Sequence, residues 1–194
     1  HASAPHQTID PIPAAAATVS GLNNIVSREL DPTQSAVVTV GHIEAGTTTN
    51  IIPASAFIEG TIRTFDEAVR SHVHGAVNRV AEGTAASHGC TCSCNVTPGY
   101  PPTINDDDQA DLAGEVASAL LGPDLFRVSA HPAFAAEDFS YVLQQVPGAM
   151  AVLGVCPDDV SPAEAAPNHS NYMRVNESAL YHGVGLYAAM AMAG

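Results

Sequence analysis

The sequence contains no lysine and no tryptophan, and arginine is the only strongly basic residue type in it. Six arginines stand against 20 acidic residues, which gives a formal net charge of −14 at pH 7. The arginines are scattered and form no basic run: Arg28, Arg63, Arg70, Arg79, Arg127 and Arg174. An acidic surface without a basic patch repels phosphate groups. We therefore expect neither nucleic acid nor an anionic membrane as a partner.

Long hydrophobic runs are also missing. The longest, Ala14–Ala17 and Tyr187–Ala193, fall far short of the roughly 20 residues that a membrane span needs. Sequence motifs of nucleotide hydrolases, dehydrogenases and serine hydrolases are absent, and so is the H-E-x-x-H zinc motif. A hydrophobic content of 46% nevertheless supports a folded core. The sequence predicts a soluble globular protein with one large or two small domains.

Four cysteines occur, and three of them, Cys90, Cys92 and Cys94, alternate with other residues. Alternation would place all three on one face of a strand, and Cys-x-Cys lacks the two-residue gap of a zinc knuckle. Buried thiols acting as small apolar side chains are the first interpretation, with a metal site as the alternative. Because no signal peptide is visible, we expect reduced thiols and a cytoplasmic location.

The first half of the chain predicts two helices and three strands. Apolar spacing and proline or aspartate starts indicate helices at 11–29 and 66–89. Strands are expected at 36–43, at a segment ending at Arg63, and at 90–96. This order corresponds to a β-α-β-β-α-β fold that lacks its first strand, which we expect before His1.

Turn residues at 99–103 form the best candidate for a domain boundary. The second half then alternates helix and strand, which is typical of an α/β domain. Helices are expected at 105–122, at 136–145 and from Asn176 onwards, and strands at 126–130 and 149–155.

Asn50 and Arg63 form the first candidate for a binding site. Asn50 lies in a glycine-led turn, and Arg63 lies thirteen residues later on the more polar face of a strand. An amide and a guanidinium can together hold a carboxylate through paired hydrogen bonds. The alternative is an ordinary surface arginine in a salt bridge and an asparagine that only forms the turn.

His169 is the second candidate, because it lies in a loop just before a helix start at Asn176. A histidine in this position can ligate a metal or carry a proton, but it can equally be a solvated loop residue. Glu137 and Asp138 are adjacent carboxylates at a predicted helix start. They can cap that helix or line a metal cleft.

Several short motifs spread over the whole chain support a family resemblance. They are H-A-S-A-P-H at His1, D-P-I at Asp10, G-T-T-T-N-I-I-P at Gly46, G-T-I-R-T-F at Gly60, Y-P-P-T-I-N at Tyr100, A-E-D-F-S-Y at Ala136, V-P-G at Val146 and N-H-S-N-Y-M-R-V-N-E at Asn168. In this order they resemble the two-domain metallo-amidohydrolases, a metallopeptidase-like family that includes aminoacylase. The similarity is greatest to the hippurate hydrolase and N-acyl-amino-acid amidohydrolase branch.

The resemblance implies a fold and a set of roles. Residues 1–103 would be a lid or dimerisation domain of α+β type, and residues 104–194 the C-terminal part of an α/β catalytic domain. His169 would be one ligand of a site for two divalent metal ions, zinc or manganese. Asn50 and Arg63 would bind the carboxylate of an N-acyl amino acid, and His1 would reach the scissile carbonyl, often across a homodimer.

The other metal ligands and the general base of that family correspond to positions before His1. We therefore expect this chain by itself to be inactive. Two hypotheses follow. The chain is part of a metal-dependent amidohydrolase, or it is a non-catalytic dimerisation or ligand-binding module that keeps Asn50 and Arg63 as a pair that binds a carboxylate, here called the carboxylate clamp.

Overall fold

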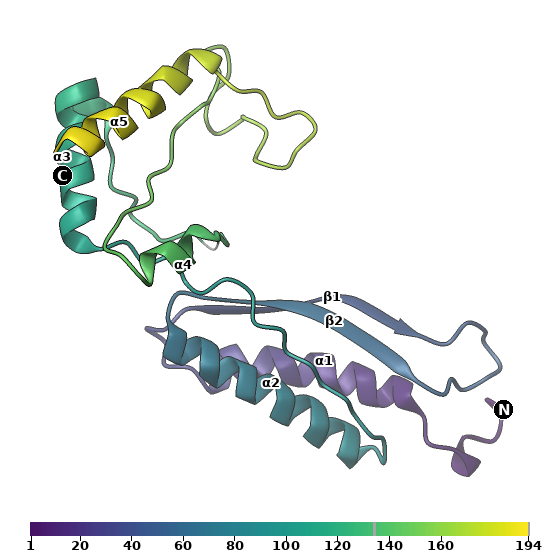
Figure 1. The fold of residues 1–194 in the computed structure, drawn as a ribbon. Helices are drawn as coiled ribbons and strands as arrows, with labels where there is room; N and C mark the ends of the chain where they lie inside the picture. Colours follow the sequence, from purple (N-terminus) through teal and green to yellow (C-terminus); the bar gives the residue numbers. More distant parts are fainter. Residues whose placement is uncertain (134, 194) are drawn as a thin grey trace. The chain divides into compact units, whose positions relative to one another are not determined.

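The computed structural model describes residues 1–133 and 135–193 (Figure 1). The chain divides into two compact units. Unit 1 comprises His1–Pro102 with Ala133–Glu137, and unit 2 comprises Thr103–Pro132 with Asp138–Gly194. The main change from one unit to the other therefore falls between residues 102 and 103.

Unit 1 is a two-stranded antiparallel sheet with two helices on one face (Figure 1). After a short 3₁₀ turn, Pro5–Gln7, the elements are α1 (Pro11–Arg28), β1 (Ala36–Ala45), β2 (Ala56–Thr64) and α2 (Glu67–Ser87). Helices and sheet together confirm the mixed α/β class predicted from the sequence.

Both helices of unit 1 begin at an aspartate that caps the first turn. The Asp10 carboxylate accepts a hydrogen bond from the backbone N–H of Ile12 at 2.9 Å. The Asp66 carboxylate accepts one from the N–H of Val69 at 2.8 Å. Each bond satisfies an N–H that the helix itself leaves without a partner. Local sequence therefore sets where these helices start.

The core of unit 1 lies between the helices and one face of the sheet. Its buried residues are Leu22, Ile25, Val69, Val73 and Ala76, and Val38, Val40 and Ile62 of the sheet pack against them. Ile25 and Val73 are completely buried. Alternation along β2 points Ile62 to the helices and its neighbour Arg63 to the open face, as expected for a strand with one buried face.

The strand expected at 90–96 is wrong. Residues 90–102 form neither strand nor helix, and within the described residues the only sheet is the β1–β2 hairpin. A strand exists only when a neighbouring backbone completes its hydrogen bonds, which local sequence cannot supply. Cys90, Cys92 and Cys94 are all free thiols in this segment, with Cys92 exposed and the other two half-buried.

Unit 2 is built from helices and long connections. Its main helices are α3 (Asp107–Leu121) and α5 (Leu180–Ala193), which pack against each other. The shorter elements are a 3₁₀ turn at Pro123–Leu125, α4 (Phe139–Leu143) and a 3₁₀ turn at Glu177–Ala179. Asp106 caps α3 by accepting from the N–H of Gln109 at 3.0 Å, and Asn176 caps the last 3₁₀ turn through the N–H of Ser178.

Two further strand predictions, at 126–130 and 149–155, are wrong, and the helix expected at 136–145 shortens to α4. Val128 is 84% exposed and Val152 is 90% exposed, so these two side chains lack the cover of a strand with a buried face. Phe126 and Leu153 instead lie close to Gly114 of α3 and Gly183 of α5. None of the described helices has both the length and the apolar character required to cross a bilayer.

Candidate functional site

The opening loop of the chain lies against the loop that joins β1 to β2. The N–H of Ala2 donates a hydrogen bond of 3.1 Å to the backbone carbonyl of Asn50. Asn50 belongs to the 46–55 loop, which begins with Gly46 at a φ of +69°. The structure therefore brings His1 and Asn50, two candidates far apart in sequence, to the same end of the hairpin.

The His1 ring is held by its neighbour Ser3. The backbone N–H of Ser3 donates to Nδ1 of His1 at 3.2 Å, and the Ser3 hydroxyl lies 2.7 Å from the same nitrogen. Because a backbone N–H can only donate, Nδ1 acts as the acceptor, and a neutral ring then carries its proton on Nε2. That proton can be donated to a carbonyl oxygen.

Arg63 lies at the opposite end of the hairpin from Asn50. Its partner across the strands is Val37, whereas Ala45 and Ala56 pair next to the 46–55 loop. The seven residue steps from Ala56 to Arg63 span about 23 Å at the usual rise of a strand. One carboxylate cannot bridge that distance, so a clamp that uses both side chains requires two chains.

On the open face of the sheet, four residues along β2 from Arg63, lies a histidine pairing that the sequence did not indicate. His42 Nδ1 is 3.8 Å from the Glu59 carboxylate, and His42 Nε2 is 3.9 Å from that of Glu44. Phe57 packs edge-on against the same ring, with centroids 5.6 Å apart. A one-residue shift in register near Gly41 aligns His42 with Glu59, and register is a property of the pair of strands.

His169 lies in a tight turn in unit 2. The N–H of Ser170 donates to the carbonyl of Pro167 at 3.1 Å, and His169 has a φ of +69°. Among the described residues it is the only non-glycine residue with positive φ. A side chain in this region costs about 1–2 kcal/mol relative to ordinary backbone. A residue kept there despite the cost is a candidate for a role that its imidazole performs.

The loop that carries His169, residues 156–175, is closed at its base. The N–H of Asn176 donates to the carbonyl of Val155 at 2.8 Å. Nη2 of Arg174 donates to both oxygens of Asp159, at 2.8 and 2.9 Å, and these bonds hold the pKa of Asp159 below its usual value. The loop therefore has a defined shape although it contains no long helix or strand.

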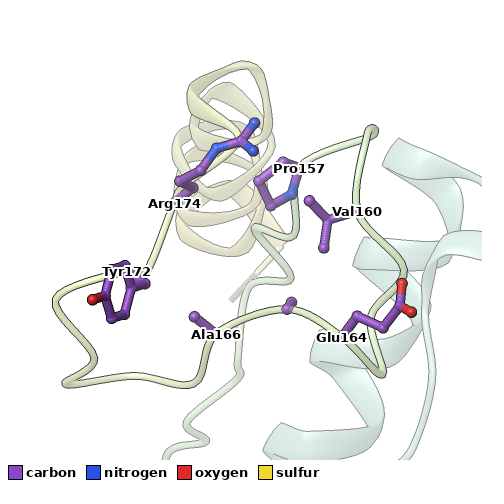
Figure 2. A pocket seen from close by; sticks show the side chains of 7 residues that line it. Pro157, Val160, Glu164, Ala166, Tyr172 and Arg174 are labelled. Carbon is purple, nitrogen blue, oxygen red and sulfur yellow. The ribbon is translucent and has the colours of Figure 1, made fainter.

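A pocket of about 230 Å³ lies inside this loop (Figure 2). Its apolar wall consists of Pro157, Val160, Ala165, Ala166 and the ring of Tyr172. Glu164 and Arg174 contribute the charged part of the lining. Since Ala166 and Tyr172 flank the turn of His169 in sequence, the pocket and the candidate metal ligand belong to one loop.

The described residues do not form a metal centre by themselves. Across residues 1–133 and 135–193, no group of three or more histidine, cysteine, aspartate or glutamate side chains is arranged to hold a metal ion. His169 can contribute one imidazole, and any further ligands would have to come from elsewhere. Asp138, which directly precedes α4, makes no capping hydrogen bond through its side chain.

Comparison with known proteins supplies the family. The model of peptidase family M20/M25/M40 matches residues 14–193. An IAA-amino acid hydrolase, ILR1-like 2, from Arabidopsis thaliana is 39% identical over 99% of this chain and 43% of its own length. An N-acetyl-L-cysteine deacetylase from Bacillus subtilis is 39% identical over 79% of this chain and 36% of its own length.

Solved structures give the same result. YXEP from Bacillus subtilis, described as a dinuclear metal-binding peptidase of the M20 family, has a TM-score of 0.74 and 33% identity over 94% of this chain and 46% of its own. A structure from methicillin-resistant Staphylococcus aureus has a TM-score of 0.83 and 25% identity over 100% of this chain and 48% of its own. The chain thus spans less than half the length of these relatives. The resemblance noted from the sequence motifs is confirmed: this chain belongs to peptidase family M20/M25/M40.

Proposed function

We propose that the whole protein hydrolyses the amide bond of N-acyl amino acids in a reaction that depends on divalent zinc or manganese. The observation that carries the proposal is the match, over 99% and 79% of the chain, to relatives named as a hydrolase and a deacetylase of modified amino acids. We further propose that the protein acts in the cytoplasm as a homodimer formed through unit 1.

The strained turn at His169 supports its role as one metal ligand, because an imidazole on a fixed turn presents its nitrogen in a constant direction. His1 would act at the scissile carbonyl of the substrate. With Nδ1 occupied by Ser3, its Nε2 proton can donate to the carbonyl oxygen and stabilise the negative charge that develops there.

Asn50 and Arg63 would bind the free carboxylate of the substrate from two protomers. One protomer would provide His1 and Asn50, and its partner would provide Arg63, since the strand separates the two groups within one chain. The Arg63 guanidinium can give two parallel hydrogen bonds to a carboxylate, which a lysine cannot reproduce.

The direct test is turnover by the full-length protein. Purified protein is assayed with N-acetyl amino acids, hippurate and indoleacetyl amino acids, before and after removal of metal by a chelator. We expect hydrolysis that is lost with the metal and restored by zinc or manganese. Methyl esters of the same substrates, which lack the free carboxylate, should react poorly. Absence of turnover with every substrate and metal would refute the proposal.

The two-protomer arrangement has its own test. Asn50→Ala and Arg63→Ala dimers should each be weakly active, and mixing them with subunit exchange creates heterodimers with one intact site. Random exchange of a twofold dimer would then restore about a quarter of the wild-type activity. No recovery, with exchange verified by mass spectrometry of tagged subunits, would place both residues in one protomer's site or in none.

A non-catalytic binding or dimerisation module is the second candidate function. It is favoured by the lack of a metal-holding group among the described side chains. Such a module would bind N-acyl amino acids with the same dependence on Arg63, and the full-length protein would neither retain metal nor turn over substrate.

A further inference from the structure

The pocket in the 156–175 loop has a rigid frame. The N–H of Glu164 donates to the carbonyl of Ser161 at 2.8 Å, and the thiol of Cys156 lies 3.4 Å from the carbonyl of Val160. The side-chain amide of Asn176 reaches Asp158 at 3.3 Å. Together with the bond that closes the base of the loop, these contacts hold the 156–164 wall and the base of the pocket in place.

The two charged groups of the lining are not equivalent. The Arg174 guanidinium already donates to both oxygens of Asp159, so its charge is neutralised within the loop. The Glu164 carboxylate makes no hydrogen bond or ion pair with the residues that the structure describes. Among the described residues, the pocket lining therefore carries one uncompensated negative charge.

The rest of the lining suits an apolar body with a cation attached. Figure 2 shows Tyr172 and Glu164 on opposite sides of the pocket, with small and apolar side chains between them. A carboxylate accepts the hydrogen bonds of an ammonium group, and an aromatic face packs against an apolar chain. An anionic ligand would instead be repelled by the carboxylate of Glu164.

We propose that this pocket binds a small organic cation, a primary amine on a short apolar chain. The ammonium group pairs with Glu164, and the chain lies on the Tyr172 ring and the wall formed by Pro157 and Val160. A volume of about 230 Å³ corresponds to seven or eight waters at about 30 Å³ each, so the ligand has fewer than about ten non-hydrogen atoms.

The test does not depend on the proposed hydrolysis, because binding is measured without turnover. The probe is n-butylammonium, titrated into the full-length protein by calorimetry, and 1-butanol serves as its neutral counterpart. We expect saturable binding of the amine and an affinity for the alcohol lower by up to about fivefold, which is the most that an exposed ion pair contributes.

Two matched variants locate the binding. Glu164→Gln should weaken binding of the amine by about two- to fivefold. Glu115→Gln removes the same charge from an exposed position on α3 outside the pocket, and it should leave the affinity unchanged. Circular dichroism checks that both variants keep the fold. Equal binding of amine and alcohol, no loss in Glu164→Gln, or no binding at millimolar amine would each overturn the proposal.

Discussion

Gly60 is the position where the structure predicts the largest effect from the smallest substitution. It lies in the middle of β2 and pairs with Val40. A Cβ added at Gly60 would lie 2.3 Å from the carbonyl oxygen of Thr39 and 3.2 Å from the Cα of Val40. Both are backbone atoms of β1, so no rotation of a side chain can relieve the contact.

The size of the effect follows from how far the strands must move. The Cβ–oxygen contact has to lengthen from 2.3 Å to at least about 3.0 Å, which separates the backbones where their hydrogen bonds are made. Overpacking of this kind costs about 1–3 kcal/mol. Replacing glycine by alanine also stabilises the folded state by about 0.4–1 kcal/mol, because it lowers the conformational entropy of the unfolded chain. We expect Gly60→Ala to lower the free energy of unfolding by about 1–2 kcal/mol.

The hairpin contains a matched control, because a Cβ at Gly41 would meet no atom within 4 Å. Gly41→Ala restricts the unfolded chain equally without the clash, so its stability should be unchanged or slightly higher. Urea unfolding followed by circular dichroism measures both variants, and the Gly60→Ala midpoint should fall by about 0.5–1 M. If Gly60→Ala were as stable as Gly41→Ala, the close approach of β1 and β2 described here would be incorrect.

Three further predictions concern single side chains. Asp66→Ala removes the acceptor for the N–H of Val69 and should cost about 1 kcal/mol in urea unfolding, whereas Asp66→Asn keeps most of the cap. Burial lowers the pKa of His74 from its ordinary value of 6.5, and Arg70 adds to this. The unfolded chain then binds more protons, so stability should fall as pH drops through about 6.5, and less steeply in His74→Gln. His169→Asn should keep the positive-φ turn and change stability by less than about 0.5 kcal/mol, while metal content and turnover decrease; unchanged metal content would exclude His169 as a ligand.

The elements that the sequence predicted correctly depend on contacts close in the chain. Asp10, Asp66 and Asp106 each bond an N–H two or three residues ahead, and apolar side chains repeat at helical spacing behind them. The alternation that points Arg63 to the open face of β2 is also local. Such features can be predicted from sequence because the interacting groups are neighbours in the chain.

The three incorrect strands show the opposite case. Residues 90–96, 126–130 and 149–155 have suitable side chains for strands, but no described segment pairs with them. A strand depends on a backbone partner that is distant in sequence, so composition and alternation alone cannot establish it.

The candidate site divides in the same way. The sequence by itself determined which side chains to consider, His1, Asn50, Arg63 and His169, because their motifs are local. Only the tertiary structure decided how they are grouped. A hydrogen bond from Ala2 joins His1 to the Asn50 loop, and strand register sets Arg63 about 23 Å along the hairpin from that loop. Distances between residues far apart in sequence are fixed by pairing and packing, and these exist only in the folded chain.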